Sequence, residues 1–417
     1  VILSVFYLSI ISIFLFLTYF SIFGFETNKF NNQIENKVKA SNDKLNIELK
    51  KIKLILDPFK LQIKIKTLGP KLIHNNKNLS FEVVQTKISI RSILKNEFSL
   101  NNLKASTNSI EIKNLISFIR SLNRSTELFI LEKFVKKGYL IADLDLNFDE
   151  KGNLKDNFEI NGFIKDAKIN FLNKYKLENL NLIFNLDKKK IQLEDVELLI
   201  NNQKFFSNNL NAIHSNNKFK ISGEIENKNI VIKKDNVDFL IKPYFKNINF
   251  KNIEFNSKNT FSFIVDKKFK VENVKIKSKI NFNEISIANK FKLKDVFPKI
   301  KDDLKFKNHV MEIEYKKDNL KIKGSGDIFI QENKDKINYS VNKNNTKFDF
   351  ESSLEINQNV LNINILDFEK NENNKAIVKI KGSKELNKKT KLDLVSLEEN
   401  SNKIFKKNLI FDKNFKI

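Results

Sequence analysis

The sequence lacks cysteine and tryptophan altogether, and its 417 residues include one methionine, three histidines, four prolines and nine glycines. Without cysteine the protein has no disulfide framework and no thiolate metal site. The absence of cysteine does not indicate whether the protein resides in an oxidising or a reducing compartment. The histidines His74, His214 and His309 are far apart in the chain and have no partners at the spacing of metal ligands. We therefore expect no metal site.

Sequence signatures of catalysis are also missing. Serine, histidine and aspartate all occur, but no Gly-x-Ser-x-Gly elbow does. The run from Gly324 to Gly326 is followed by neither a lysine nor a helix start, so it does not resemble a phosphate-binding loop. Acidic pairs such as Asp302-Asp303 are typical of solvated turns. We predict that the protein is not an enzyme and that it needs no cofactor.

Residues 1–25 contain no charged side chain and consist almost wholly of Ile, Leu, Phe, Val, Tyr and Ser. A helix of this length reaches about 37 Å, enough for a hydrocarbon core of roughly 30 Å with tilt. A signal peptide has a shorter apolar core and a small-residue cleavage site, which residues 21–24 match poorly. The sequence predicts an uncleaved transmembrane anchor. Because the chain opens on Val1, we expect residues before it to be missing, and the Lys/Arg bias cannot orient the anchor.

The formal net charge of +25 would normally suggest a nucleic acid or an anionic membrane as partner. However, the lysines are spread along the polar faces of many segments, as at Lys275, Lys277 and Lys279. A nucleic-acid site more often has a concentrated basic stripe with aromatic stacking positions. We therefore favour a solvated face and expect no nucleic-acid partner. Attraction to anionic lipid head groups remains the alternative.

Strict alternation of apolar and polar residues dominates residues 139–201. Leu144, Leu146 and Phe148 alternate with acidic or amide residues, which is typical of a strand with one apolar face. Similar runs cover residues 158–171, 177–184 and 191–200. The charged turns between them are too short for crossover helices, so the sequence predicts an antiparallel meander.

A smaller unit, apolar-x-Asn/Asp-apolar-x-apolar, recurs in these runs and beyond them. Its spacing breaks the alternation by one residue, as a β-bulge would while keeping the apolar residues on one face. The alternative is that Asn and Asp are merely common and lie in turns. The unit occurs at residues 177–182, 193–198, 245–250, 250–255 and 271–276.

Helical spacing of apolar residues is confined to a few segments. Residues 114–137 show it on both sides of a break at 123–126, which predicts two short helices. These helices either cover one end of the sheet or act as a lid or membrane-surface element. A second helix-like pattern, with Pro298 near its start, lies around residues 293–306, and residues 27–40 are compatible with a short helix.

Three runs resemble the repeat of the AsmA-like proteins, the TamB and YhdP type of bridge-like lipid transfer protein in Gram-negative bacteria. They are residues 138–145, 149–156 and 160–169. The family's repeat is a strand, an Asp/Gly turn, a strand ending in Gly-x-hydrophobic-x-Asp/Asn-Ala, and then the apolar-x-Asn/Asp-apolar unit. The chain is similar to this family in architecture over residues 1–390, and sharply so over 85–200.

The resemblance implies a mainly β protein with an N-terminal transmembrane helix followed by a long curved antiparallel sheet, a repetitive β-groove, and a few short helices. It further implies a single-pass protein of the bacterial inner membrane, with its body in the periplasm, that serves phospholipid transport between membranes and outer-membrane biogenesis. Its partners would be membrane lipids, with acyl chains in the groove, and an unidentified protein of the periplasm or outer membrane. The family has no catalytic motif to carry over.

Two other functions fit the same residues. One is a membrane-anchored structural or adhesion scaffold built of β-sandwiches with dry cores and no lipid ligand. The other is a binder of an anionic polymer. The expected organisation is an anchor at 1–25, an N-terminal β module at 26–113, amphipathic helices at 114–137, the β-groove at 138–390 and a weakly patterned tail at 391–417.

The candidate lipid-binding residues are those that alternation, corrected for bulges, places on one apolar face of the meander. Two steps, from Ile164 to Ile169 and from Leu193 to Leu198, change parity and need a bulge to stay on that face. The ten candidates are Leu144, Leu146, Phe148, Ile160, Ile164, Ile169, Leu182, Phe184, Leu193 and Leu198.

Overall fold

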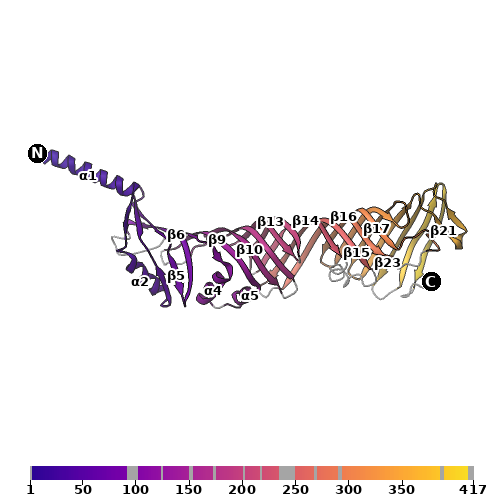
Figure 1. Cartoon of the computed structure of the whole chain (residues 1–417), viewed down its shortest axis with the longest axis horizontal. Coiled ribbons are helices and arrows are strands. Elements are labelled where there is room, and N and C mark those ends of the chain that lie inside the picture. The colour runs from indigo at the N-terminus through magenta and orange to yellow at the C-terminus, as the bar shows by residue number, and fades with distance from the viewer. Residues whose placement is uncertain are drawn as a thin grey trace. The chain divides into compact units, whose positions relative to one another are not determined.

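The computed structural model describes residues 2–91, 102–123, 125–149, 154–171, 175–200, 202–216, 218–233, 249–266, 270–289, 294–385 and 389–411. The chain forms two compact units. Unit 1 comprises residues 1–202 and 208–215, and unit 2 comprises residues 203–207 and 216–417. The protein is mainly β, with 67% of its residues in strands, and it has one large antiparallel sheet and few helices. Both features confirm the prediction from alternation (Figure 1).

The first elements of unit 1 are helix α1 (Ile2–Ile22), strand β1 (Phe25–Thr27) and helix α2 (Asn31–Ser41). Helix α1 has 21 residues, none of them charged, and most of its described apolar side chains are exposed. Among the residues that the structure describes, no helix combines the length and the hydropathy that crossing a membrane requires. The predicted span over residues 1–25 thus has no support from the described residues.

Antiparallel pairing continues through the rest of unit 1. Strand β3 pairs with β1 and β4, β4 with β6, β6 with β7, and β7 with β9, after which β9 to β12 follow one another in order. A side hairpin joins β2 to β5 and β5 to β6. The strands are β2 (Leu45–Glu48), β3 (Ile52–Asp57), β4 (Gln62–Leu68), β5 (Lys71–His74), β6 (Lys77–Ser89), β7 (Asn102–Thr107), β8 (Ile110–Glu111), β9 (Val135–Asn147), β10 (Glu159–Phe171), β11 (Tyr175–Leu186) and β12 (Lys190–Ile200).

The two short helices predicted between residues 114 and 137 are present. Helix α4 (Ile112–Leu122) and helix α5 (Thr126–Phe134) stand beside β9 and β10 (Figure 1). The Ser125 side chain caps α5 by accepting a hydrogen bond from the Leu128 backbone N–H at 3.2 Å, as small hydroxyl residues commonly do at a helix start. Ile116 and Phe118 bury the inward face of α4.

Unit 2 is built from long strands in sequence order. Strand β13 (Gln203–Ser215) contributes residues to both units. In unit 2, each strand from β14 to β20 pairs with the next, β20 then pairs with β23, and β25 follows β24. The strands are β14 (Lys218–Lys233), β15 (Phe250–Asp266), β16 (Val271–Ala288), β17 (Asp303–Lys316), β18 (Asn319–Phe329), β19 (Asp335–Asn344), β20 (Lys347–Ile356), β23 (Ala376–Glu385), β24 (Thr390–Glu399) and β25 (Asn402–Phe411).

A small hairpin lies between β20 and β23. It consists of β21 (Leu361–Ile363), the 3₁₀ turn η1 (Asn364–Leu366) and β22 (Phe368–Lys370). Two strands, β24 and β25, occupy most of the region where the sequence shows only a weak pattern.

The helix expected around residues 293–306 is not formed. Its described residues, from 294 to 302, make turns, and strand β17 already begins at Asp303. Phe297 and Leu304 are both buried, at 7% exposure, in a core shared with several strands. Their apolar spacing therefore reflects two separate insertions into that core and not one face of a helix.

The apolar-x-Asn/Asp unit forms bulges, as predicted. Asn179, Asp195 and Asn273 have φ angles of 50°, 48° and 53°, the left-handed region that Asn and Asp tolerate better than other side chains. Register shifts accompany these residues in the pairings of β10 with β11, β11 with β12, and β15 with β16. The unit at 250–255 has a register shift without a positive φ, and the unit at 245–250 lies largely outside the described residues.

Candidate functional site

The ten candidate residues lie on one face of the sheet in unit 1, here called the inner face of unit 1. Directly paired residues of an antiparallel sheet share a face, and the register pairs Leu144 with Ile160, Ile164 with Leu182, and Phe184 with Leu193. The other members follow from alternation along the same strands and from the bulges. Phe148 continues β9 through an isolated bridge to Leu154.

Left-handed residues keep this face apolar where alternation alone would fail. Asp166 has φ 52° and Asp195 has φ 48°. The residues that follow them, Ala167 and Val196, are 1% and 3% exposed. The bulged N–H of Asp166 is taken up by the neighbouring strand, because it donates to the Oδ1 atom of Asn181 at 2.9 Å. A bulge thus lies at each of the two predicted positions, between Ile164 and Ile169 and between Leu193 and Leu198.

The inner face of unit 1 is only partly covered. Of the ten candidates, Leu182 alone is buried, at 7% exposure, and the other nine are half-buried. In a sandwich of two sheets packed about 10 Å apart, such residues would interdigitate and be lost from solvent. This apolar row therefore contacts protein on part of its surface and leaves the rest accessible.

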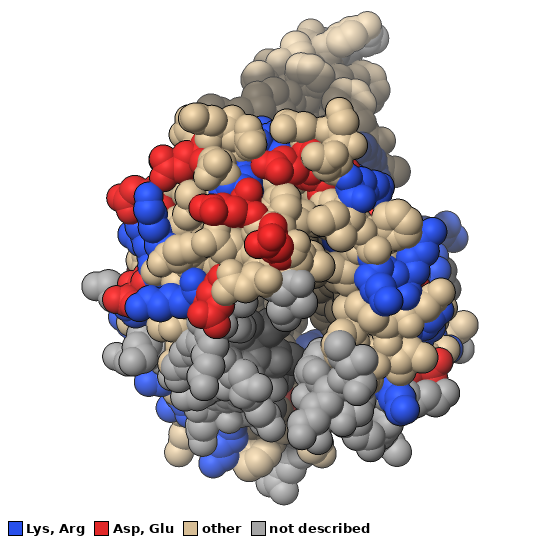
Figure 2. Space-filling view, turned by 90° about the vertical axis from the view of Figure 1, so that its right-hand side faces the viewer, with Lys and Arg blue, Asp and Glu red and all other residues tan. Residues whose placement is uncertain are grey.

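The opposite, outer face carries charges of both signs. In unit 2, Lys279 pairs with Glu312 and Glu312 with Lys323, which makes a ladder of alternating charge across three strands. Figure 2 looks at the end of unit 2 that lies at the right of Figure 1, and there basic and acidic side chains also occur among uncharged ones. In the ladder of Lys279, Glu312 and Lys323 the lysines stand beside acidic residues and do not form a purely basic stripe. Phe163 and Ile183, exposed by 43% and 48% and paired with each other, are an apolar exception on the outer face of unit 1.

Glycines stand opposite aromatic residues on the inner faces. Gly162 pairs with Phe184, and a Cβ atom added to Gly162 would lie 2.8 Å from Phe184 Cζ. Gly382 pairs with Phe350, where the corresponding distance is 2.9 Å. Gly324 pairs with Tyr339, whose ring occupies the place of the missing side chain. In each pair the ring therefore lies against the backbone of its neighbour, as in the known rescue of strand glycines by aromatic residues.

On the inner face of unit 2, the apolar side chains are buried at one end of the strands and more exposed at the other. The buried end is here called the closed edge of unit 2. The row Ile232, Ile253 and Ile285 is 8%, 4% and 9% exposed. Towards the other edge, the row Phe261, Ile276, Tyr315 and Leu320 is half-buried or exposed. Strands β15 and β16 carry residues of both rows, so their apolar character continues along the strand while the covering does not.

Protein covers the closed edge of unit 2. Phe297, from the turns before β17, packs with Leu361 of the small hairpin and with Ile356, which is 0% exposed. The backbone N–H of Asn362 donates to the Val296 carbonyl at 3.0 Å and so ties the hairpin to the turns. This end of the apolar face is a dry core.

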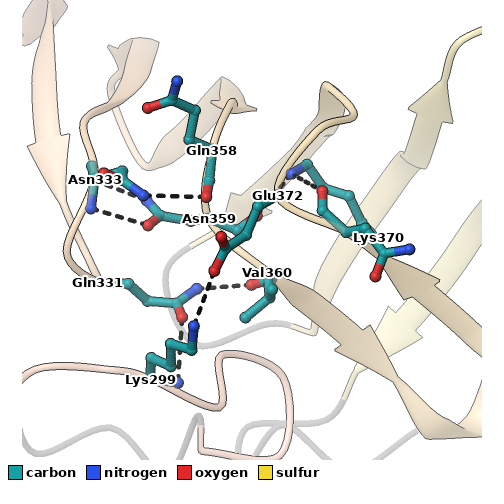
Figure 3. Close-up of polar contacts among 9 residues, drawn as sticks. Lys299, Gln331, Asn333, Gln358, Asn359, Val360, Lys370 and Glu372 are labelled. Atoms are coloured by element: carbon teal, nitrogen blue, oxygen red, sulfur yellow. Dashed lines mark hydrogen bonds and ion pairs between the residues drawn. The ribbon is translucent and has the colours of Figure 1, made fainter.

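A buried polar network fastens the same hairpin (Figure 3). The Lys370 ammonium group is 0% exposed and donates to the carbonyls of Asn357, Asn359 and Asn371 at 2.6, 2.7 and 2.9 Å. Asp335, also 0% exposed, accepts from the Asn357 N–H at 2.9 Å and from Asn359 Nδ2 at 2.7 Å. Burial raises the pKa of Asp335 and lowers that of Lys370. Neither residue has a sequence signal that sets it apart from a surface charge.

His309 is the most buried histidine of the inner face of unit 2, at 2% exposure. Its Nε2 atom lies 3.0 Å from the Tyr339 hydroxyl, its ring stacks on the tyrosine ring, and its Nδ1 atom has no hydrogen-bond partner among the described residues. Burial lowers the pKa of His309 and raises that of Tyr339 to about 12. Alternation with Met311 and Ile313 places His309 on the inner face, and the left-handed Asn308 before it, with φ 48°, keeps Phe306 on that face as well.

None of these groups forms a metal site, since the described part of the chain contains no cluster of three His, Asp or Glu side chains that could hold an ion. The chain matches no protein-family model, no curated protein and no solved structure.

Proposed function

We propose that this protein is a lipid carrier in which acyl chains lie along the inner face of unit 1 and along the open side of the inner face of unit 2. On this proposal the sheet curls into a groove, the lipid is a phospholipid, and the transfer runs between the two membranes of a Gram-negative bacterium. The resemblance of residues 138–169 to AsmA-like repeats supports that setting.

The observation that carries the proposal is the partial exposure of the ten candidate residues. Burying an apolar side chain stabilises a protein by about 25 cal/mol per Å², so an apolar face that stays accessible has either a partner or a cost. The ten residues form continuous cross-strand rows, and a row of this kind suits mobile hydrocarbon chains better than a single compact ligand. Unbranched acyl chains need only apolar contact, which this face supplies.

Helix α1 supports a membrane setting. Its exposed apolar side chains, such as Phe14 at 68% and Leu15 at 61%, would be costly in water, and it carries no charge that would oppose insertion. We propose that α1 inserts in the inner membrane and that the two units lie in the periplasm, where the groove meets lipid.

A structural scaffold is the second candidate, and the dry core at the closed edge of unit 2 favours it. There Ile356, Leu361 and Phe297 pack against protein as they would in a sandwich. The two functions differ in what fills the inner face of unit 1, and this difference can be tested directly.

The test places a photo-crosslinking phenylalanine analogue at Phe184 on the inner face of unit 1 and, in a second variant, at Phe163 on the outer face. The two positions are matched, because both are native phenylalanines on adjacent paired strands and Phe163 is the more exposed of the two. After irradiation in cells, we expect phospholipid adducts at Phe184, detected by mass spectrometry, and few at Phe163.

Adducts to protein alone at Phe184 would refute the carrier and favour the scaffold. Equal lipid adducts at both positions would mean non-specific contact with the bilayer, and would also count against a groove. Leu146 and the outward-facing Asp145 form a second matched pair on strand β9, and should show the same contrast.

A further inference from the structure

A cavity of about 620 Å³ lies in unit 1 where α4 ends and α5 begins, against the turn between β5 and β6. It is separate from the inner face of unit 1, since none of the ten candidate residues lines it. Its volume is within the range of small-molecule sites, about 300–1,000 Å³.

The walls of this cavity are cationic and rich in hydrogen-bond donors. Lys77 and Arg120 line it together with the hydroxyl residues Ser125 and Thr126, and among the described residues no carboxylate lines it. Such a set of donors fits an anion with several oxygen atoms, above all a phosphate group, which Lys and Arg bind through charge-assisted hydrogen bonds.

The cations are held in place by partners that leave part of their donor capacity for a ligand. Lys77 Nζ donates to the carbonyl and the hydroxyl of Ser117 at 3.0 and 2.6 Å, which uses two of its three N–H groups. Arg120 forms an ion pair with Glu132 through one terminal nitrogen of its five-donor guanidinium group. Both side chains are thus positioned before a ligand arrives.

One exposed apolar side chain, that of Phe129, lines the cavity, and other exposed apolar side chains lie elsewhere on α4 and α5. Ile119 and Leu122 on α4 are 39% and 41% exposed, and Phe129 and Leu131 on α5 are 47% and 48% exposed. Phe129 lies under two cations, with Arg120 Cζ at 5.3 Å and Lys133 Nζ at 5.4 Å from its ring centre. A polar anion site that includes an exposed apolar side chain fits an amphiphile, with its phosphate in the cavity and its chains across the two helices.

We infer that this cavity binds the phosphate head group of an anionic phospholipid, while Phe129 contacts the glycerol and the upper acyl chains. The inference rests on the proposed lipid function and adds to it a site of entry or docking with a preference for negative head groups. It also gives the two short helices a specific role, that of a membrane-surface element.

The absence of native tryptophan allows a clean test, because Leu122→Trp introduces the one tryptophan of the chain. The full-length protein in neutral detergent micelles is titrated with dioctanoyl phosphatidylglycerol, with dioctanoylglycerol and with inorganic phosphate, and tryptophan emission is followed. We expect a saturable blue shift with phosphatidylglycerol and at least tenfold weaker binding of the other two.

The cation variants are made in the same tryptophan background. Lys77→Gln and the pair Arg120→Gln with Glu132→Gln should each weaken phosphatidylglycerol binding at least tenfold, whereas Lys77→Arg and the exposed control Lys165→Gln should bind as the parent does. Circular dichroism confirms folding. Arg120 and Glu132 are changed together so that no unpaired carboxylate is left beside the cavity.

Three outcomes would overturn the inference. Equal binding of dioctanoylglycerol means apolar association without head-group recognition, equal binding of inorganic phosphate means a site for free phosphate, and unchanged binding in both cation variants means that the cavity is not the site. The crosslinking at Phe184 does not involve these residues, so the groove and the head-group site can fail independently.

Discussion

Three glycines let aromatic rings lie flat on the inner faces. A ring that covers a glycine on the adjacent strand fills the space of the missing side chain and projects less into the space above the sheet. For Phe184 over Gly162, the ring keeps this part of the inner face of unit 1 apolar. Tyr339 over Gly324 differs, because its hydroxyl group brings a polar atom to the face and is bonded to His309.

His309 should make the stability of unit 2 depend on pH. Its pKa is lowered in the folded protein by burial, so the unfolded chain takes up the proton first as the pH falls below about 6.5, the ordinary value for histidine. Stability is therefore complete above that pH and declines below it, by at most about 1.4 kcal/mol per pH unit. His309→Phe, which keeps the stacking on Tyr339, should flatten this decline.

Urea unfolding of the full-length protein between pH 5 and pH 8 measures the effect. His214→Phe provides the control, since His214 is exposed on β13. An equal flattening in both variants would contradict the assignment to His309.

Tyr339 should make stability fall at alkaline pH, where His309 has no effect. Burial raises the pKa of Tyr339 to about 12, so the unfolded chain loses the proton first and stability is lost from about pH 10 upwards.

The left-handed Asn and Asp residues show how much of the fold single residues predict from the sequence. A period-two pattern interrupted by a change of parity was enough to predict one bulge between Ile164 and Ile169 and another between Leu193 and Leu198. The same reasoning could have been applied to Asn308 and His309, but a histidine in an alternating run has no apolar character to mark it as inward-facing. Burial of Lys370 and Asp335 could not be foreseen, because it depends on the small hairpin and strand β19 both meeting the segment 357–359, which no sequence pattern shows.

The small hairpin β21–β22 depends on Lys370. Lys370→Met keeps the aliphatic stem but removes the donor for three carbonyls, and unsatisfied buried groups cost about 1–3 kcal/mol each before local relaxation. We expect the hairpin to lose about 3 kcal/mol of protection against opening, measured by hydrogen exchange of the amides between residues 357 and 371. The loss should be local, because the paired strands beneath the hairpin remain intact.

Lys299→Met is the matched control for that experiment. Lys299 forms an ion pair with Glu372 at 2.8 Å in the same network, but its side chain is 66% exposed (Figure 3). Exposed pairs contribute about 1 kcal/mol or less, so exchange should change little. Similar effects of both substitutions would show that burial of the ammonium group is not what secures the hairpin.

Helical elements were predicted with mixed success, for a physical reason. Residues 112–134 contain apolar positions on one continuous face and a serine cap, so local and tertiary preferences agree. Around residues 293–306 the apolar spacing is the same, but the segment contains Pro298 and forms turns. Phe297 and Leu304 enter the core of unit 2 separately, one from the turns and one from β17. Spacing alone could not distinguish a helix from a chain that enters a core twice.

At the scale of the whole chain, the apolar surface of α1 predicts retention in membranes. If α1 inserts as proposed, the full-length chain should stay in the membrane pellet after alkaline carbonate extraction, and a variant lacking residues 2–22 should be released. The chain with Asp substituted at Phe14 and Leu15, two exposed positions, should be released as well, since charge opposes insertion. Release of the unaltered protein would contradict the proposed insertion of α1 in the membrane.

From β14 to β20, every strand pairs with the one that follows it in the chain. A newly made strand therefore finds its partner in the segment that left the ribosome or the secretion channel just before it. Local pairing of this kind forms fast and does not wait for distant segments. The sheet can accordingly grow at its most recent edge during synthesis, and an additional hairpin would lengthen it without disturbing the strands already in place.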